Sequence, residues 1–199
     1  MYKNIIFDVG NVLLSYDWRG AMAKAGIDED DINMFGEGVL NCRVWPEFDL
    51  GIRPYFEIVE DMCKLFPNCA DGMRKFLTNV ENMPLPRPKV WEKVHLLKEK
   101  GYKLYILSNY SKYMFDAHAM TCPFVDDMDG MMVSYMIHVN KPDKGIYDAL
   151  LEKYNLDAKE SLFFDDKEEN VKAAIKYGID AVTITSEEFL LNELDKLLV

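Results

Sequence analysis

Several features that commonly point to a function are missing from this 199-residue sequence. The four cysteines include no CxxC pair, and their spacing from the three histidines does not resemble that of a zinc site. No apolar run is long enough to cross a membrane, and the first residues lack a basic flank followed by an apolar signal segment. The sequence also has no internal repeat and no low-complexity segment. We therefore expect a cytoplasmic protein with reduced thiols.

Positive charge is also scarce, because 23 Lys and Arg oppose 34 Asp and Glu to give a formal net charge of −11. This balance argues against nucleic acid or an anionic membrane surface as the main partner. If the substrate is an anion, a cation must mediate its contact with the protein. The hydrophobic content of 49% is typical of a folded chain, and the length allows one substantial core plus a modest second unit. We expect a monomer or a weak dimer.

The N-terminal stretch contains the first candidate functional residue. Ile5, Ile6 and Phe7 form a continuous apolar run, which suits a strand buried on both faces of a parallel sheet. Asp8 follows, and Gly10 then tolerates the backbone angles of a tight turn. A carboxylate at the C-terminal end of such a strand faces the crevice where open α/β sheets bind ligands. The alternative is that Asp8 only opens a turn.

The remainder of the chain divides into a helical part and an alternating part. Residues 17–83 read as short helices, and three alternating prolines within residues 84–88 form a semi-stiff connector at their exit. From residue 89 onward, helices and strands alternate, which predicts an α/β fold with a Rossmann-like parallel sheet and helices on both faces. We predict a core domain of residues 1–16 and 84–199, with residues 17–83 inserted as a small helical domain.

Polar residues end three of the predicted strands: Asp8, Ser108-Asn109 and Asp165-Asp166. Parallel strands bring these ends to one edge of the sheet, and Lys141 begins a helix in the same alternating series. Such a set suits phosphoryl transfer, in which catalysis is mostly positioning and charge neutralisation, and its carboxylates suit Mg²⁺. Taken separately, Ser108 could be a turn hydroxyl and Lys141 a solvated lysine at a helix start.

Four stretches in this order resemble the motifs of the haloacid dehalogenase superfamily, mostly Mg²⁺-dependent phosphatases with an α/β core and a mobile cap. They are Phe-Asp-Val-Gly-Asn-Val, Ile-Leu-Ser-Asn, Asn140-Lys141-Pro142 with Ile146-Tyr147, and Phe-Phe-Asp-Asp-Lys-Glu-Glu-Asn. The resemblance spans the predicted core, and the helical insertion falls where the family's cap sits. Within the family, the first and last motifs look most like the α-D-glucose-1-phosphate phosphatase group.

The resemblance implies a catalytic role for Asp8, Ser108 and Lys141, and a phosphate-binding role for Ser108, Asn109 and Lys141. Asp8 would be the nucleophile and form an aspartyl-phosphate. Ser108 and the backbone amide of Asn109 would hold the transferring phosphoryl group, and Lys141 would offset its charge. The implied substrate is a small phosphorylated metabolite, with sugar phosphates such as glucose 1-phosphate as the specific expectation.

The resemblance also implies a Mg²⁺ site. Asp8, the carbonyl of Gly10 and Asp166 would bind the metal, while Asp165 and Asn170 would support them. Most phosphatases of the family have an aspartate where this chain has Gly10, and that aspartate protonates the leaving group. Without it, sugar 1-phosphates should react faster than primary alkyl phosphates such as glucose 6-phosphate. A cap residue or a held water that replaces the acid would remove this preference.

Three other functions compete with a phosphatase. Gly10 favours a non-catalytic phosphate- or partner-binding protein, although the nucleophile, lysine and metal carboxylates are all present. A phosphoacceptor signalling domain also uses aspartates and a lysine, but the insertion is too large for one. A dehalogenase would not need the Asp165-Asp166 pair.

A few residues outside the motifs have two open interpretations. Asp49 and Trp45 lie between predicted helices and could face the substrate, as could Phe48, with core packing the alternative for the two aromatics. His138 either lines the pocket or has a structural or surface role. His95 and His118 lie in helical stretches, and we assign them no function.

Overall fold

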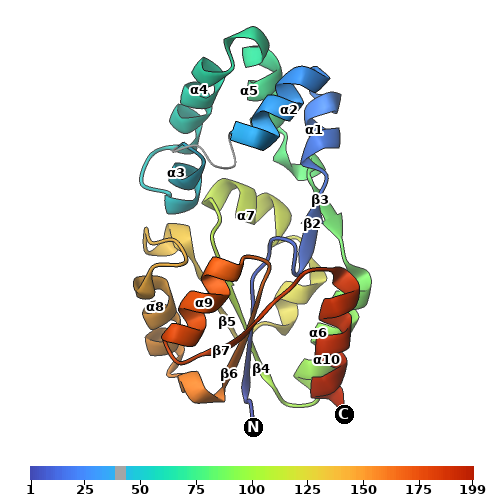
Figure 1. Cartoon of the computed structure of the whole chain (residues 1–199), viewed down its shortest axis with the longest axis vertical. Coiled ribbons are helices and arrows are strands. Elements are labelled where there is room, and N and C mark those ends of the chain that lie inside the picture. The colour runs from blue at the N-terminus through green and yellow to red at the C-terminus, as the bar shows by residue number, and fades with distance from the viewer. Residues whose placement is uncertain (39–43) are drawn as a thin grey trace.

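A five-stranded parallel sheet forms the centre of the computed structural model, which describes residues 1–38 and 44–199 (Figure 1). Its strand order is β5-β4-β1-β6-β7, and every neighbouring pair is parallel. The strands are β1 (Asn4–Phe7), β4 (Lys103–Ser108), β5 (Gly130–Val133), β6 (Ser161–Asp165) and β7 (Asp180–Thr183). The predicted α/β fold with a parallel sheet is therefore confirmed.

Strand β1 lies in the middle of this sheet because both of its faces are apolar. Ile5 and Phe7 join the hydrophobic cluster on one face, and Ile6 joins the cluster on the other. All three are 0% exposed, as the continuous apolar run predicts. The chain crosses from β1 to neighbours on both sides, so the carboxyl end of β1 lies at the switch point where open α/β sheets bind ligands.

Helices cover both faces of the sheet. Helices α8 (Lys144–Tyr154) and α9 (Glu168–Lys176) pack on the face of Ile6, whereas α6 (Pro88–Glu99) and α10 (Glu187–Leu198) pack on the face of Ile5. Helix α7 (Lys112–His118) follows β4 at the carboxyl edge. Short 3-10 turns complete the connections: η1 (Pro67–Cys69), η2 (Val80–Asn82), η3 (Pro123–Asp127), η4 (Ser134–Met136) and η5 (Ala158–Glu160).

The helical insertion lies beyond the carboxyl ends of the strands (Figure 1). Its helices are α1 (Trp18–Lys24), α2 (Glu29–Gly38), α3 (Trp45–Leu50), α4 (Tyr55–Leu65) and α5 (Ala70–Thr78). An aromatic cluster holds them together, since the ring of Phe35 contacts those of Trp18, Trp45, Phe66 and Phe76. Residues 39–43 of the predicted insertion, which include Cys42, lie outside the described residues.

The entry and exit of the insertion pair with each other. Strand β2 (Leu14–Tyr16) runs antiparallel to β3 (Pro84–Pro86), so part of the predicted proline connector forms one strand of a two-stranded ribbon. Proline lacks a backbone N–H but is tolerated in an edge strand, and a two-stranded ribbon consists of edges alone. No helix among the described residues combines the length and apolar character needed to span a membrane.

Candidate active site

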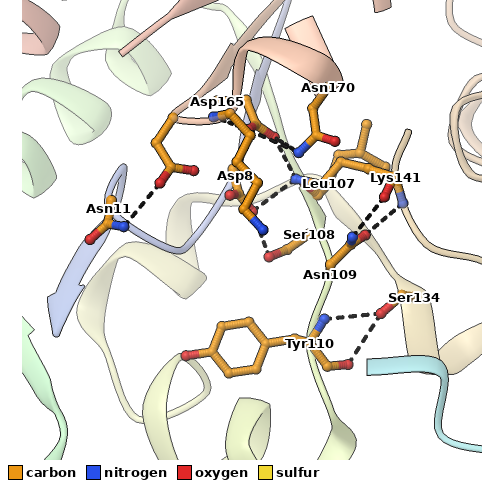
Figure 2. Close-up of polar contacts among 12 residues, drawn as sticks. Asp8, Asn11, Leu107, Ser108, Asn109, Tyr110, Ser134, Lys141, Asp165 and Asn170 are labelled. Atoms are coloured by element: carbon orange, nitrogen blue, oxygen red, sulfur yellow. Dashed lines mark hydrogen bonds and ion pairs between the residues drawn. The ribbon is translucent and has the colours of Figure 1, made fainter. Parts of the chain in front are cut away.

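The side chains that end the central strands meet with the Lys141 side chain at one point (Figure 2). Asp8 follows β1, Ser108 ends β4, and Asp165 ends β6. Ser108 Oγ donates to Asp8 Oδ1 at 2.6 Å, and Lys141 Nζ lies 3.0 Å from the same oxygen. Two residues that lie one hundred or more positions from Asp8 in the chain thus contact the same oxygen of its carboxylate. The structure brings together the motifs that the sequence singled out.

Lys141 is buried between two carboxylates. Its side chain is 1% exposed, and Nζ donates to Asp165 Oδ2 at 2.6 Å and to the Leu107 carbonyl at 2.9 Å, besides pairing with Asp8. Burial opposes the charged form, but Asp165 and Asp8 outweigh it and raise the pKa of Lys141 above its ordinary value. The ammonium therefore stays charged at this point of the site.

The Asp8 carboxylate is also desolvated, with 7% exposure. Burial and the neighbouring carboxylates of Asp165 and Asp166 raise its pKa to about 6, although Lys141 and Ser108 act in the opposite direction. Both donors meet Oδ1, and none of the described residues donates a hydrogen bond to Oδ2. Asp8 therefore combines one fixed oxygen with one that is not committed to the protein.

Asp165 is fully committed to its neighbours. It is 0% exposed and accepts hydrogen bonds from Lys141 Nζ, from Asn170 Nδ2 at 3.0 and 3.1 Å, and from the Lys167 backbone N–H at 2.8 Å. Asp166 is partly exposed, and its Oδ2 accepts from Asn11 Nδ2 at 2.9 Å. Asp165 is therefore suited to orienting its neighbours, while Asp166 retains a free oxygen.

The carboxylates also form the one possible metal-binding group found among the described residues. Asp8, Asp165 and Asp166 each offer an oxygen within 4.8 Å of the others. Gly10 lines the same cavity, and the buried Oδ1 of Asn170 has no hydrogen-bond partner. A donor set made only of oxygen suits a hard cation such as Mg²⁺ better than zinc or copper, whose sites usually include histidine or cysteine.

Asn109 fixes the segment that carries Lys141. Its Nδ2 donates to the Lys141 carbonyl at 3.0 Å, and its Oδ1 accepts from the Lys141 backbone N–H at 2.7 Å. This reciprocal pair joins the end of β4 to the loop before α8. The Asn109 side chain is thereby occupied, and only its backbone remains for a ligand.

A cavity of about 430 Å³ lies over these residues. Its floor is formed by the polar residues of the sheet edge, including Asp8, Ser108, Lys141 and Asp166. Its opposite wall comes from the helical insertion and is mostly aromatic: Trp18, Phe35, Trp45, Asp49 and Phe76. A volume of this size suits a small metabolite, with polar groups at one end and apolar surface at the other.

A buried hydrogen-bonded chain in this cavity was missed by the sequence reasoning, which gave His118 no role. His118 Nε2 lies 2.7 Å from the Val80 carbonyl, so this nitrogen carries the proton. Nδ1 then accepts from Tyr110 at 2.7 Å, and the Tyr110 oxygen accepts from Tyr16 at 2.5 Å. Burial lowers the pKa of His118, which favours this neutral form. The helical period places His118 on a core face, but no sequence signal indicates its partners.

Of the other residues considered in the sequence analysis, some line the cavity and some do not. Phe48 is 1% exposed and packs in the core of the insertion, whereas Trp45 and Asp49 line the cavity. His138 is exposed and does not line the cavity, and its Nδ1 lies 2.8 Å from the Leu50 carbonyl. His95 lies on the surface against Asp127.

Comparison with known proteins gives a family match over most of the chain. The model of a family described as haloacid dehalogenase-like hydrolase matches residues 2–178. The sesquiterpene phosphatase astK of Aspergillus oryzae is 24% identical over 200 residues, covering 98% of this chain and 96% of that protein. The D-ribitol-5-phosphate phosphatase of Bacteroides thetaiotaomicron is 22% identical over 192 residues, covering 90% of each.

A solved structure has the same fold. It is a HAD family enzyme of Bacteroides thetaiotaomicron in complex with magnesium and inorganic phosphate, and it superimposes with a TM-score of 0.73 at 21% identity. The match covers 94% of this chain and 96% of that one. The likeness therefore includes the helical insertion as well as the sheet.

Proposed function

Because the chain belongs to the haloacid dehalogenase-like hydrolases, we propose that it is a Mg²⁺-dependent phosphatase acting on small phosphorylated metabolites. The observation that carries the proposal is the shared oxygen of Asp8. Lys141 and Ser108 fix Oδ1 from one side, while Oδ2 has no donor from the described residues. A carboxylate held in this way can present its second oxygen to an electrophile.

In the proposed reaction, Asp8 Oδ2 attacks phosphorus and forms an aspartyl-phosphate as the alcohol departs. Ser108 Oγ and the backbone N–H of Asn109 hold the transferring phosphoryl oxygens. The ammonium of Lys141 offsets their charge, and its own position is fixed by Asp165 Oδ2 at 2.6 Å. Water then attacks phosphorus, which releases phosphate and restores Asp8.

Asp8, the carbonyl of Gly10 and Asp166 would hold the Mg²⁺, with Asp165 and Asn170 orienting them. Bound Mg²⁺ supplies the positive charge that lets an anionic phosphate approach three carboxylates. The buried Oδ1 of Asn170 and the raised pKa of Asp8 support this assignment, because both reflect polar groups that the protein alone leaves poorly compensated. A dehalogenase would have no use for the carboxylate cluster, so the phosphatase is the better candidate.

The substrate proposal is a sugar phosphate such as glucose 1-phosphate. The cavity of about 430 Å³ supports it, as does the resemblance of the motifs to the glucose-1-phosphate phosphatase group. The named relatives act on other phosphates, a sesquiterpene phosphate and ribitol 5-phosphate by their names, so the alcohol part varies among them. We also propose that residues 17–83 act as a cap domain over a core of residues 1–16 and 84–199.

A panel of phosphorylated metabolites, assayed for released phosphate with Mg²⁺ and with excess chelator, tests the proposal. We expect turnover only with Mg²⁺, with glucose 1-phosphate among the substrates. Borohydride quenching during turnover should convert Asp8 to homoserine, which mass spectrometry of the peptides detects. Phosphate binding without turnover of any ester would instead favour the non-catalytic binding protein.

A further inference from the structure

The position two residues after Asp8 contributes no acid, because it is Gly10. A Cβ added there would lie 3.6 Å from Tyr16 Cε2 and 3.9 Å from Asp8 Oδ2, which are ordinary contacts. A Cβ therefore fits beside Asp8, but glycine itself has no side chain that can protonate a leaving oxygen. A phosphatase that releases ordinary alcohols needs a proton donor from elsewhere in the cavity.

Asp49 is the carboxylic acid on the opposite wall of that cavity. It lies on α3 of the helical insertion and lines the cavity together with Asp8 and Lys141. None of the described residues makes a hydrogen bond to its side chain. A partly buried carboxyl group without a partner among the described residues, in the same cavity as the proposed nucleophile, is available to a bound substrate.

The segment that carries Asp49 is fixed to the core by its backbone. Ser134 Oγ donates to the Asp49 carbonyl at 2.6 Å, and His138 Nδ1 lies 2.8 Å from the Leu50 carbonyl. Gly51 ends α3 with a positive φ of 62°, and a Cβ there would lie 2.9 Å from Tyr135 Cβ. Only glycine permits this close approach. Figure 1 shows α3 at the lower end of the insertion, next to the core.

We propose that Asp49 is the general acid and general base of this enzyme, in place of the aspartate absent at Gly10. The inference rests on the proposed phosphatase function. In the first step, protonated Asp49 gives its proton to the leaving oxygen while the bond from Asp8 to phosphorus forms and the ester P–O bond breaks. In the second, ionised Asp49 takes a proton from the water that attacks phosphorus, the bond to Asp8 breaks, and Asp49 is protonated again.

The charges around Asp49 suit both steps. Burial raises its pKa, Lys167 and Lys141 act against this, and Asp8 adds to it, so that the pKa reaches about 7. The negative charge of Asp49 in turn helps to raise the pKa of Tyr110, for which burial is the main cause. Both protonation states are therefore accessible near neutral pH, as a group that must donate and then accept a proton requires.

Tyr16 is the competing donor, because it also lines the cavity beside Gly10. Its hydroxyl proton is committed to Tyr110, in a chain that ends on His118 and the Val80 carbonyl. Burial raises the pKa of Tyr16 well above its ordinary value, so it cannot alternate between acid and base at neutral pH. The geometry thus favours Asp49.

The test is Asp49→Asn, assayed with a poor and a good leaving group. For glucose 6-phosphate, kcat/KM should fall by about 10²–10⁴-fold, the usual contribution of general acid catalysis. For p-nitrophenyl phosphate, whose leaving group needs no proton, kcat/KM should change by less than about fivefold. Its kcat should still fall, because the second step lacks a base, and nitrophenol should appear as a burst of one equivalent per enzyme.

Two further variants make the test specific. Glu47→Gln is the matched control, since Glu47 lies on the same helix and pairs with Arg53 Nη1 at 2.7 Å, away from the cavity. This substitution should leave kcat/KM unchanged for both substrates. Gly10→Asp in the Asp49→Asn background should restore much of the activity on glucose 6-phosphate, because a Cβ at position 10 makes only ordinary contacts and lies 3.9 Å from Asp8 Oδ2.

The outcomes separate the two proposals. If Asp49→Asn lowers kcat/KM by the same factor for both substrates, Asp49 is not the proton donor and the inference is overturned. The same holds if kcat/KM changes for neither substrate. Wild-type protein that hydrolyses no phosphate ester with Mg²⁺ overturns the proposed function itself. Far-ultraviolet circular dichroism and thermal unfolding of each variant show whether a loss of activity comes from a loss of fold.

Discussion

Replacing Asp8 with asparagine should abolish turnover and at the same time stabilise the metal-free protein. An amide has the shape of the carboxylate but cannot attack phosphorus. Asp8 is 7% exposed, and burial is the main cause that raises its pKa from 3.8 to about 6. The folded state therefore binds this proton more tightly than the unfolded chain does, and the ionised carboxylate opposes folding.

Raising the pKa of Asp8 from 3.8 to about 6 means that ionising this carboxyl costs ~3 kcal/mol more in the folded state than in the unfolded chain. Above about pH 6, Asp8 is ionised in both the folded and the unfolded state, so the buried carboxylate destabilises the fold by the full ~3 kcal/mol. As the pH falls from about 6 toward 3.8, this destabilisation disappears, because Asp8 becomes protonated first in the folded state and then also in the unfolded chain. We expect Asp8→Asn to raise the free energy of unfolding by ~3 kcal/mol at pH 8, and by about half of that at pH 5.

Urea unfolding with chelator present, at pH 8 and at pH 5, measures this difference. Adding Mg²⁺ should stabilise the wild type and leave Asp8→Asn nearly unchanged, because ligands stabilise only the form that binds them. Asp30→Asn is the matched control, since Asp30 is exposed on α2 and its replacement should change the free energy of unfolding by less than ~0.5 kcal/mol.

Two results would refute this reasoning. If Asp8→Asn is less stable than the wild type at pH 8 in chelator, then Lys141 and Ser108 outweigh the desolvation of Asp8. The carboxylate would then hold the fold together instead of opposing it. If the folded variant keeps near-normal phosphatase activity, Asp8 is not the nucleophile.

Three further predictions concern the same site. Lys141→Met should lower the free energy of unfolding by about 3–5 kcal/mol in urea titrations, because it leaves the buried carboxylates of Asp8 and Asp165 without their cation. A variant as stable as the wild type would contradict this ion pairing. Asp166→Ala should raise the Mg²⁺ concentration needed for half-maximal activity or remove activity altogether, and full activity in excess chelator would exclude a metal-dependent reaction. In Asp49→Asn, kcat/KM should fall more for glucose 6-phosphate than for glucose 1-phosphate, because an anomeric hydroxyl departs with less protonation. If the ratio of the two kcat/KM values is the same as in the wild type, Asp49 does not act as the acid.

The central sheet and its polar edge could be predicted because their signals are local. An apolar run followed by a carboxylate describes β1 and Asp8, and the same pattern recurs at β6 with Asp165. Parallel strands necessarily align their carboxyl ends, so four short motifs were enough to predict that their polar residues share one edge. The helical insertion was also predictable, because apolar residues recur at helical spacing in α4 and α5.

The pairing of β2 with β3 was not predictable in the same way. Each strand has three residues, and two of the three in β3 are proline, so neither has a periodicity to detect. Helix α3 has only six residues, with Pro46 in its first turn, and is also too short to show a helical periodicity. Both elements exist because of contacts with distant segments, which override weak local preferences.

The sequence by itself determined the sheet, the ends of its strands and the identity of the residues around Asp8. Only the tertiary structure decided which side chains face that carboxylate from outside the motifs. Asp49 is a single acidic residue on a short helix, and its position over the cavity depends on backbone hydrogen bonds to Ser134 and His138, about ninety residues away. The hydrogen-bond partners of His118 are likewise brought to it by the packing of separate elements. A side chain's type is written in the sequence, but its neighbours depend on how separate elements pack, and no local pattern records that packing.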